Sequence, residues 1–380
     1  MIVIGAGKAS AAMAQAVESY YGNGLEGLVV TRDGYACPTQ SIEVIEAAHP
    51  VPDHRSVRAA DRILSLASSA TQNDLVLCLW SGGASALMVA PVAGLSFDEK
   101  QRINSELLAS GATIAEINSV RKHLSAVKGG RLGLACGSAQ VVSLIVSDVV
   151  GDDPSVIASG PTVADPTTCA DALAVLRRYQ IPISAEVDKS LNQGLWESPK
   201  ALGGDVRNTI VARPRDCFRA AANFAAAENL AFLDLGDHFD GLVDNVAADH
   251  AARIRDVLDG RCSIKPPCVI VSGGEAVVRV TGRGCGGPNT EFCLALAQQL
   301  QGASRVYALA CDSDGTDGKG SHAGAFIGPD TLVKARQLGL DAAISRANND
   351  TATYFEAMGD LIVTGPTYTN VNDFRAMLII

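Results

Sequence analysis

The chain has 380 residues, 47% of them hydrophobic, and its 31 Lys and Arg against 41 Asp and Glu give a formal net charge of −10. This length predicts two domains of ordinary size, and the hydrophobic fraction excludes a disordered chain. The pI of about 5.1 and the lack of a Lys/Arg block exclude a nucleic-acid footprint, and no apolar run approaches the roughly 20 residues that span a bilayer.

The ten cysteines are scattered along the chain without a CxxC pair or a Cys/His spacing suited to zinc. We interpret them as reduced thiols of a cytoplasmic protein. The N-terminus has no basic segment ahead of an apolar one, so the sequence gives no sign of export.

Short β-branched runs alternate with Ala-rich amphipathic stretches, a pattern typical of α/β folds with parallel sheets. The loop-like composition of residues 196–205 predicts a boundary between domains over residues 1–200 and 201–380. Strands are expected over residues 1–4, 27–31, 43–49, 75–80, 140–147, 209–212, 231–236, 268–273, 277–282, 306–311, 323–327 and 361–365. Helices are expected over residues 9–20, 56–69, 97–108, 170–179, 216–228, 242–258 and 289–300.

The first strand, MIVI, runs into the glycine turn GAGK and then into a helix. Backbone N–H groups at such a helix start attract an anion, and Lys8 after Gly7 adds a full positive charge. The dinucleotide fingerprint G-x-G-x-x-G/A is incomplete, because Ser10 stands at its last position. Arg32 after the second strand keeps an NADP site open, and a plain turn with a solvated lysine is the structural alternative.

A second glycine turn follows the strand LVLCLW, in the motif WSGGASALM. Gly82 and Gly83 would let a ligand approach the backbone closely, while Ser81 and Ser85 supply hydroxyl groups. No Gly-Lys-Ser/Thr follows, so this is not a Walker loop, and a plain turn is again the alternative.

Cations are densest in the segment INSVRKHLSAVKGGRLG. In an acidic chain this segment is the best candidate for binding an anionic ligand, and a solvated helix face is the alternative. Its His123 is either a hydrogen-bonded structural residue or a catalytic one. The cations are Arg121, Lys122, Lys128 and Arg131.

Two acidic loops follow apolar strands. Asp148 and Asp152 lie in SDVVGDDPS, and Asp312, Asp314 and Asp317 lie in DSDGTDG. Crowded carboxylates suit Mg²⁺ or a general base, whereas Asx turns and helix caps are the structural alternative. The second loop is not an EF-hand, because its Asp spacing differs.

The most glycine-dense segment, GRGCGGPNTEF, precedes an amphipathic stretch. Its backbone is a candidate for wrapping a nucleotide, with Asn289 or Glu291 orienting it. Near the C-terminus, the polar run TGPTYTNVNDF includes Asn370 and Asn372 and predicts a pocket lining or a cap after a buried strand.

In chain order, GAGKAS, HPVPD, SGGASALM, INSVRKHLSAVKGGRLG, SDVVGDDPSVIASGPT, SGGEA, GGPNTEF, DSDGTDG and TGPTYTNVND resemble the motifs of the glycerate 2-kinase family, whose C-terminal part is the MOFRL domain. The series covers nearly the whole chain. The resemblance implies two α/β/α domains with the active site in a cleft between them: a Rossmann-like N-terminal domain with a parallel sheet, and a C-terminal domain with a mixed sheet that contains the MOFRL region, about residues 266–380.

The resemblance also implies ATP-dependent phosphorylation of D-glycerate at its 2-hydroxyl, which gives 2-phospho-D-glycerate. Phosphoryl transfer asks for cations on the phosphoryl group and the substrate carboxylate, Mg²⁺ on the phosphates and a carboxylate that takes the hydroxyl proton. ATP and Mg²⁺ are therefore the expected cofactors, and a small molecule is the expected partner in place of nucleic acid or membrane. A homodimer is left open.

Carried onto this chain, the resemblance implies three groups of site residues. The catalytic residues are expected to be Lys8, Arg121, Asp148 and Asp312. The metal ligands are expected to be Asp152, Asp314 and Asp317. Binding of substrate and phosphate is expected from Gly7, Ser81, Gly82, Gly83, Ser85, Lys128, Asn289, Glu291, Asn370 and Asn372.

The chain departs from the family pattern in three places. Pro288 stands where the family has an arginine that faces the site, and Thr290 replaces a glutamine, so a bidentate contact is lost unless Arg283 or Arg213 substitutes. The family's Gly-Glu-Ala is replaced by GLV at residues 241–243. Family members also begin with a helical segment ahead of the first strand, which this sequence lacks.

Other functions stay open beside the kinase. An NAD(P)-dependent hydroxypyruvate reductase would use the same GAGKAS turn. A diverged kinase would act on another small sugar acid, and Pro288 motivates a non-catalytic binding protein as a further alternative.

Overall fold

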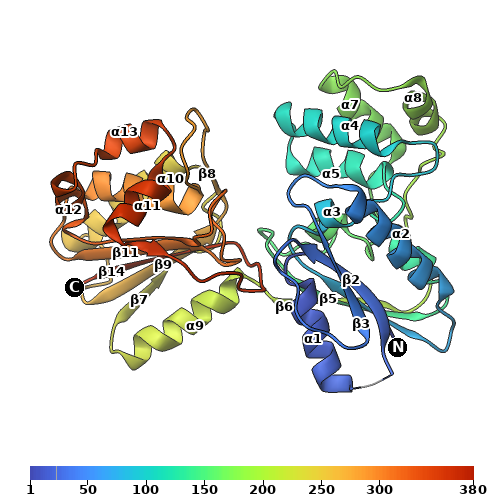
Figure 1. Ribbon diagram of the computed structural model, residues 1–380, viewed down its shortest axis with the longest axis horizontal. Helices are drawn as coiled ribbons and strands as arrows, with labels where there is room; N and C mark the ends of the chain where they lie inside the picture. The colour runs from blue at the N-terminus through green and yellow to red at the C-terminus, as the bar shows by residue number, and fades with distance from the viewer. Residues whose placement is uncertain (23) are drawn as a thin grey trace. The chain divides into compact units, whose positions relative to one another are not determined.

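The computed structural model describes residues 1–22 and 24–380 in two compact units, Met1–Val211 and Ala212–Ile380 (Figure 1). The sequence places the boundary near residue 200, and the structure divides the chain later because residues 206–212 belong to the first sheet. An α/β fold with a parallel sheet in the first unit and a mixed sheet in the second confirms the expected fold class.

The first unit is built on a six-stranded sheet. Neighbours among its first five strands pair in parallel, as expected for strands joined by helical crossovers. In sheet order the strands are β3 (Ile42–Ala47), β2 (Glu26–Arg32), β1 (Ile2–Ala6), β4 (Leu75–Trp80), β5 (Gln140–Val146) and β6 (Val206–Ala212).

Helices cover both faces of this sheet. Successive side chains of each strand point to opposite faces, and the apolar ones on each face are buried against helices. Val3 and Leu79 belong to a core with the apolar side of α1 (Ser10–Tyr21). Ile4 belongs to a second core with the apolar side of α2 (His54–Ser69). The central strands are therefore buried on both faces, which explains their nearly continuous apolar sequences.

The remaining helices of this unit lie in two connections. The Ser96 hydroxyl accepts a hydrogen bond from the N–H of Glu99 (3.1 Å) and so caps the helix that begins at Phe97. Thr113 and Glu116 form a capping box at the start of the helix that begins at Ile114. Between β4 and β5 are α3 (Ala84–Leu87), α4 (Phe97–Ala109), α5 (Ile114–His123) and α6 (Arg131–Ala135). Between β5 and β6 are the 3₁₀ turn η1 (Ile157–Ser159), α7 (Cys169–Arg178) and α8 (Ala185–Asn192).

The second unit holds a mixed six-stranded sheet. Its strand pairs are antiparallel except for the parallel pair at one edge, β7 with β9. In sheet order the strands are β13 (Leu361–Ile362), β12 (Gly324–Ile327), β11 (Val306–Asp312), β14 (Asp373–Ile379), β9 (Cys268–Gly274) and β7 (Ala231–Asp234). A separate short parallel pair joins β8 (Gly241–Leu242) and β10 (Ala276–Val277).

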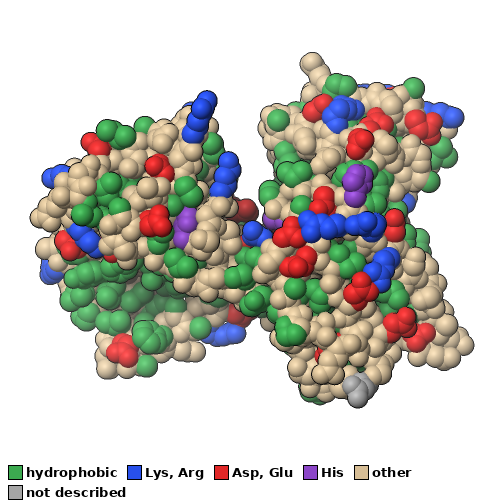
Figure 2. Space-filling model, viewed as in Figure 1, with side chains coloured by type: hydrophobic (Ala, Val, Ile, Leu, Met, Phe, Trp, Pro, Cys, Tyr) green, Lys and Arg blue, Asp and Glu red, His purple; other side chains and the backbone are tan. Residues whose placement is uncertain are grey.

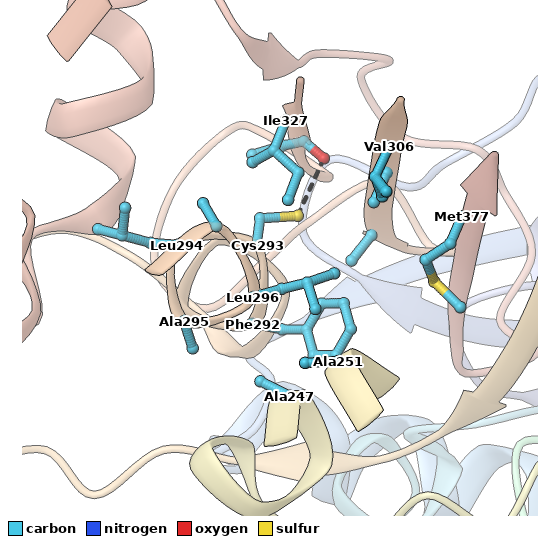
Figure 3. Close-up of a cluster of buried hydrophobic side chains, with 14 of the residues drawn as sticks. Ala247, Ala251, Phe292, Cys293, Leu294, Ala295, Leu296, Val306, Ile327 and Met377 are labelled. Carbon is cyan, nitrogen blue, oxygen red and sulfur yellow. Dashed lines mark hydrogen bonds between the residues drawn. The ribbon is translucent and has the colours of Figure 1, made fainter. Parts of the chain in front are cut away.

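One face of the mixed sheet carries the main core of this unit. Phe292 and Leu296 are fully buried in it, and the Cys293 thiol donates to the carbonyl of Ala325 at 3.2 Å (Figure 3). The core packs against α10 (Val243–Leu258) and α11 (Pro288–Leu300). The remaining helices of the unit are α12 (Thr331–Gln337), α13 (Ala342–Ala347) and α14 (Thr351–Met358).

The opposite face of the mixed sheet is covered over part of its width by α9 (Pro214–Ala227), whose Phe218 packs against Phe374. The uncovered part is apolar: Figure 2 shows a broad hydrophobic area there, and Phe326, stacked on Tyr307, is 40% exposed. Among the described residues, no helix combines the length and apolarity that crossing a membrane would require.

The expected helices are present, with ends within two residues of those predicted. The expected strand over residues 277–282 is wrong, since only Ala276–Val277 pairs, and the N–H groups of Thr281 and Gly282 donate to Asn349 Oδ1 instead, both at 2.8 Å. The sequence also missed β14, whose inward positions begin with the charged Asp373 and Arg375 in place of apolar residues.

Candidate functional site

The two glycine turns of the first unit lie together at the carboxyl ends of β1 and β4. The Lys8 N–H donates to the carbonyl of Gly82 at 2.9 Å, and the Ala9 N–H donates to Ser81 Oγ at 3.0 Å. Gly7 has φ 127°, and a Cβ there would lie 2.2 Å from Ser81 Oγ. Ser81 therefore joins the turns, and only glycine fits at position 7.

Gly83 brings Lys8 close to the HPVP segment. Gly83 has φ 83° and begins α3. A Cβ on it would lie 3.0 Å from His49 Nε2 and 3.4 Å from Lys8 Cγ. The aliphatic part of Lys8 thus packs close to a residue that forms part of a cavity wall, described next.

That cavity has a volume of about 280 Å³ and lies within the first unit. Its charged lining residues are Lys100, Arg121 and Lys128, and no Asp or Glu among the residues that the structure describes contributes to its wall. The lining residues are His49, Pro50, Val51, Pro52, Gly83, Ser85, Ala86, Val89, Lys100, Gln101, Asn104, Ser105, Leu108, Arg121 and Lys128.

The lysines of this cavity are buried with neutral partners. Lys128 Nζ donates to the carbonyl of Ser85 at 2.7 Å, and Lys100 Nζ donates to the carbonyl of Leu124 at 2.6 Å. Each lysine is only 2% exposed. Over the part of the chain that the structure describes, neither lysine, nor Arg121, forms an ion pair. We define Lys100, Arg121 and Lys128 as the cationic pocket.

Burial shifts the titration of these cations. Burial, with the charges of Arg121 and Arg131, lowers the pKa of Lys100 to about 7. Burial, with the charges of Lys100 and Arg121, holds the pKa of Lys128 well below its ordinary value, and burial alone lowers that of Arg121. Like charges in a desolvated wall are costly unless an anion joins them, so the cavity suits an anionic ligand.

The other basic residues of the predicted cationic segment have structural partners. Lys122 pairs with the buried Asp165 at 3.3 Å, and His123 Nδ1 lies 2.8 Å from the carbonyl of Ser119. Arg131 Nη2 donates to the carbonyl of Trp196 at 2.6 Å. The alternative of a solvated helix face is wrong for Lys122 and His123, which are buried, and His123 has the hydrogen bond of a structural residue.

The first acidic loop lies outside the cavity wall. Asp148 follows β5 and is half-buried, and Asp152 adopts φ 55° with its N–H on the carbonyl of Val149 at 3.1 Å. Neither residue lines the cavity. Their expected roles as base and metal ligand therefore stay predictions.

The second acidic loop continues β11. Asp312 pairs in register with Asp373 of β14, and Asp312 Oδ1 accepts the N–H of Asp314 at 2.8 Å. Asp314 is 1% exposed, and its Oδ1 accepts the N–H of Thr316 at 2.7 Å. Asp314, Asp317 and Asp373 are thus almost fully buried, whereas Asp312 is half-buried.

Asp317 stabilises the start of α11. Its Oδ1 accepts the N–H of Asn289 at 2.9 Å, and its Oδ2 accepts the N–H of Thr290 at 2.8 Å and the Thr290 hydroxyl at 2.9 Å. Burial raises the pKa of Asp317 to about 6, although these donors oppose the shift. The geometry gives Asp317 the work of a helix cap, while its expected role as a metal ligand stays a prediction.

Asp373 and Arg375 lie beneath the same loop. Asp373 accepts from Asn289 Nδ2 and from Arg375 Nη2, both at 2.6 Å, and burial raises the pKa of Asp373. Arg375 is fully buried over the Phe292 ring. Asn289 is therefore held in place by Asp317 on one side and Asp373 on the other.

The remaining predicted binding residues are spread around this unit. Glu291 pairs with Arg346 Nε at 2.8 Å, which places it at a second cavity of about 340 Å³. Asn372 has φ 67°, and its carbonyl accepts the N–H of Ser313 at 3.1 Å. The neighbouring Asn370 is buried, so this C-terminal segment lies against the second acidic loop.

Sequence reasoning placed Gly83, Ser85, Arg121 and Lys128 at a binding site, and the structure brings these residues to one cavity. It missed Lys100 and Asn104. The signal was present, because Lys100 shares a helical face with Ile103 and Leu107, so a charge occupies a core-facing position of α4.

Known proteins match the whole length of the chain. Residues 1–192 match the domain of unknown function DUF4147, and residues 268–373 match the MOFRL family. A putative hydroxypyruvate reductase from Agrobacterium vitis is 48% identical, with 100% of this chain and 87% of the relative covered. The D-glycerate 2-kinase of Thermotoga maritima is 37% identical, with 100% and 91% covered.

Solved structures agree with these relatives. The crystal structure of glycerate kinase from Thermotoga maritima superposes with a TM-score of 0.91 at 38% identity, covering 100% of this chain and 91% of the other. A Pyrococcus horikoshii protein superposes with a TM-score of 0.81 at 35% identity, covering 100% and 88%.

Proposed function

Because the chain belongs to the glycerate 2-kinase family, we propose that it transfers a phosphoryl group from ATP to the 2-hydroxyl of D-glycerate and releases 2-phospho-D-glycerate. The observation that carries the proposal is the cationic pocket, where Lys100, Arg121 and Lys128 line one cavity without a carboxylate. Substrate and product of this reaction are both anions.

The cationic pocket offers what phosphoryl transfer needs from the protein. The transferred group and the substrate carboxylate carry negative charge, and preorganised cations in a desolvated wall stabilise that charge without reorganising. Lys8, which packs close to the lining residue Gly83, is proposed to contact the reacting groups, and Gly7, Ser81, Gly82 and Ser85 are proposed to support the turn.

The acidic loop of the second unit fits a magnesium ion by the chemistry of its donors. Asp312 and Asp314 present carboxylate oxygens, which Mg²⁺ prefers, and Asp314 is buried. We propose Asp314 as a holder of Mg²⁺, Asp312 as a candidate base, and Asn289 and Glu291 as residues that support ATP. When bound, Mg²⁺ neutralises charge on the phosphates.

A carboxylate must take the proton of the 2-hydroxyl. Asp148 in the first unit and Asp312 in the second are the proposed bases, and an Asn variant of each separates them. The base is the residue whose Asn variant lowers kcat far more than it raises KM for either substrate.

The proposed reaction is tested with the purified chain, D-glycerate, ATP and Mg²⁺. ADP release is followed together with the formation of 2-phosphoglycerate, which enolase consumes directly. The same chain is incubated with hydroxypyruvate and NAD(P)H. Oxidation of the nicotinamide without ADP release would replace the kinase by the reductase, and no turnover in either assay would favour a binding protein.

We also propose a cytoplasmic location, which the ten free thiols support. A homodimer stays a prediction. The molar mass in solution tests it, because the chain alone has a mass of 39.3 kDa.

A further inference from the structure

Helix α4 contributes two polar side chains to the cavity, Lys100 and Asn104, four residues apart and so on the same helical face. Asn104 Oδ1 is buried and has no hydrogen-bond partner among the described residues. A buried carbonyl oxygen without a donor costs about 1 to 3 kcal/mol, so this atom requires a donor that comes with a ligand or with water.

Both lysine side chains of the cavity donate to backbone carbonyls. Lys100 Nζ donates to the carbonyl of Leu124, and Lys128 Nζ donates to that of Ser85. Arg121 completes a wall of cations that attracts an anionic group. The cavity therefore combines positive charge for an acid with a buried acceptor, Asn104 Oδ1, that can take a hydrogen bond from a hydroxyl group.

We propose that Asn104 Oδ1 accepts a hydrogen bond from the non-reacting 3-hydroxyl of the acid substrate while the cationic pocket holds its negative charge. This inference rests on the proposed function. The reacting 2-hydroxyl must give its proton to a base, and an amide oxygen is too weakly basic for that task. Asn104 is thus a specificity-determining residue, which selects small acids with a second hydroxyl over acids that lack it.

The test is a cycle of two ligands and two proteins. D-lactate keeps the carboxylate and the 2-hydroxyl of D-glycerate but has hydrogen in place of the 3-hydroxyl. Isothermal titration calorimetry on the full chain measures the Kd of both acids for the wild type and for Asn104→Ala. The wild type is expected to bind D-glycerate about tenfold more tightly than D-lactate, the worth of one hydrogen bond.

In Asn104→Ala the difference between the acids is expected to fall below about twofold, through weaker binding of D-glycerate alone. Asn104→Ser serves as a second small variant, and circular dichroism checks that both variants are folded. Glu106→Gln is the matched control on the same helix, since Glu106 pairs with Arg102 outside the cavity, and it should keep the wild-type preference.

Three results would overturn the assignment: a wild type that binds both acids equally, an Asn104→Ala that keeps the preference, or one that loses affinity for both acids alike. The last result would make Asn104 a structural residue or the holder of a water molecule. The proposed function fails separately, since a wild type that discriminates between the acids but releases no ADP contradicts the kinase and leaves the role of Asn104 intact.

Discussion

The tripeptide Ser-Gly-Gly follows an apolar run of sequence in each unit, and the two copies have different structural roles. Ser81-Gly82-Gly83 lies beyond the end of β4, where its backbone turns into α3 and forms part of the cavity wall. Ser272-Gly273-Gly274 lies inside β9, still paired with β14. Identical residues after similar apolar runs thus contribute to a cavity wall in one unit and to a stretch of sheet in the other.

The neighbours of the two tripeptides explain the difference. Ser272 Oγ lies 2.6 Å from Nε2 of the buried His250, and burial lowers the pKa of that histidine to about 4. A Cβ on Gly274 would lie 2.6 Å from the backbone N of Phe239. The second tripeptide is small because other backbone packs on it, whereas Gly83 is small beside a space that a ligand can enter.

The largest expected effect comes from removing the cation beside the first tripeptide. Lys8→Ala should lower kcat/KM for D-glycerate by at least about 10²-fold, because the positive charge proposed to contact the reacting groups is lost. Lys189→Ala, an exposed lysine on α8, is the control and should leave the rate unchanged. A near-normal rate in Lys8→Ala would make the first turn as purely structural as the second.

The next effect separates the tripeptides by stability. Gly274→Ala should lower the free energy of unfolding by about 3 kcal/mol, because φ is 120° and the new Cβ would meet backbone. Gly83→Ala should cost about 1 kcal/mol, since φ is 83° and the nearest atom belongs to the side chain of His49. Urea unfolding measures both, and equal losses would contradict the comparison.

A smaller effect concerns pH. The pKa of Lys100 in the folded chain is about 7, so Lys100 loses its positive charge within the range of this experiment. Anions bind best when Lys100 is protonated, because only the protonated lysine is charged. Affinity for D-glycerate should fall as pH rises from 6 to 9, by less than about tenfold per unit. Lys100→Met should reduce this pH dependence of the affinity, and titration of Lys128 should account for the part that remains. The other basic groups nearby are His49, Arg121 and Arg131. An unchanged profile in Lys100→Met would remove Lys100 from the site.

The same shift has a consequence for stability. Between pH 7 and about 10.4 the unfolded chain binds more protons at Lys100 than the folded chain, so the free energy of unfolding of the ligand-free protein should gain a favourable contribution as pH rises across this window. Below pH 7 both forms are protonated, and the cost of burying the charge is fully present. Lys100→Met should lack this contribution, which urea unfolding at pH 7 and pH 9 measures.

Local patterns predicted the strands of the first sheet and seven of the helices, but they missed α3, α5, α6, α8, α12, α13 and α14. The central strands of the first unit are recognisable as apolar runs, because they are buried on both faces. Amphipathic helices such as α2 and α10 are recognisable because their apolar residues recur with the helical period. β14 does not, because Asp373 and Arg375 occupy inward positions where the pattern needs apolar residues. Asp373 accepts from Arg375 and from Asn289, and Arg375 also lies over the Phe292 ring, so both buried charges have partners.

The residue types of the candidate site could be predicted from the sequence, but the direction in which each side chain points could not. Arg121 and Lys122 are adjacent, yet Arg121 lines the cavity and Lys122 pairs with Asp165. That choice depends on a carboxylate more than forty residues away in the sequence, which no local pattern reveals. Lys100 and Asn104 escaped notice because a polar residue in a helix usually faces water.

Every cation of the cationic pocket comes from a single stretch of chain, the connection between β4 and β5 that contains α3 to α6. The strands of the first sheet contribute none of them. With the proposed substrate site in this pocket, substitutions within that one connection would alter which acid is accepted while the sheet stays as it is. Substrate preference would then diverge through one crossover without a change of scaffold.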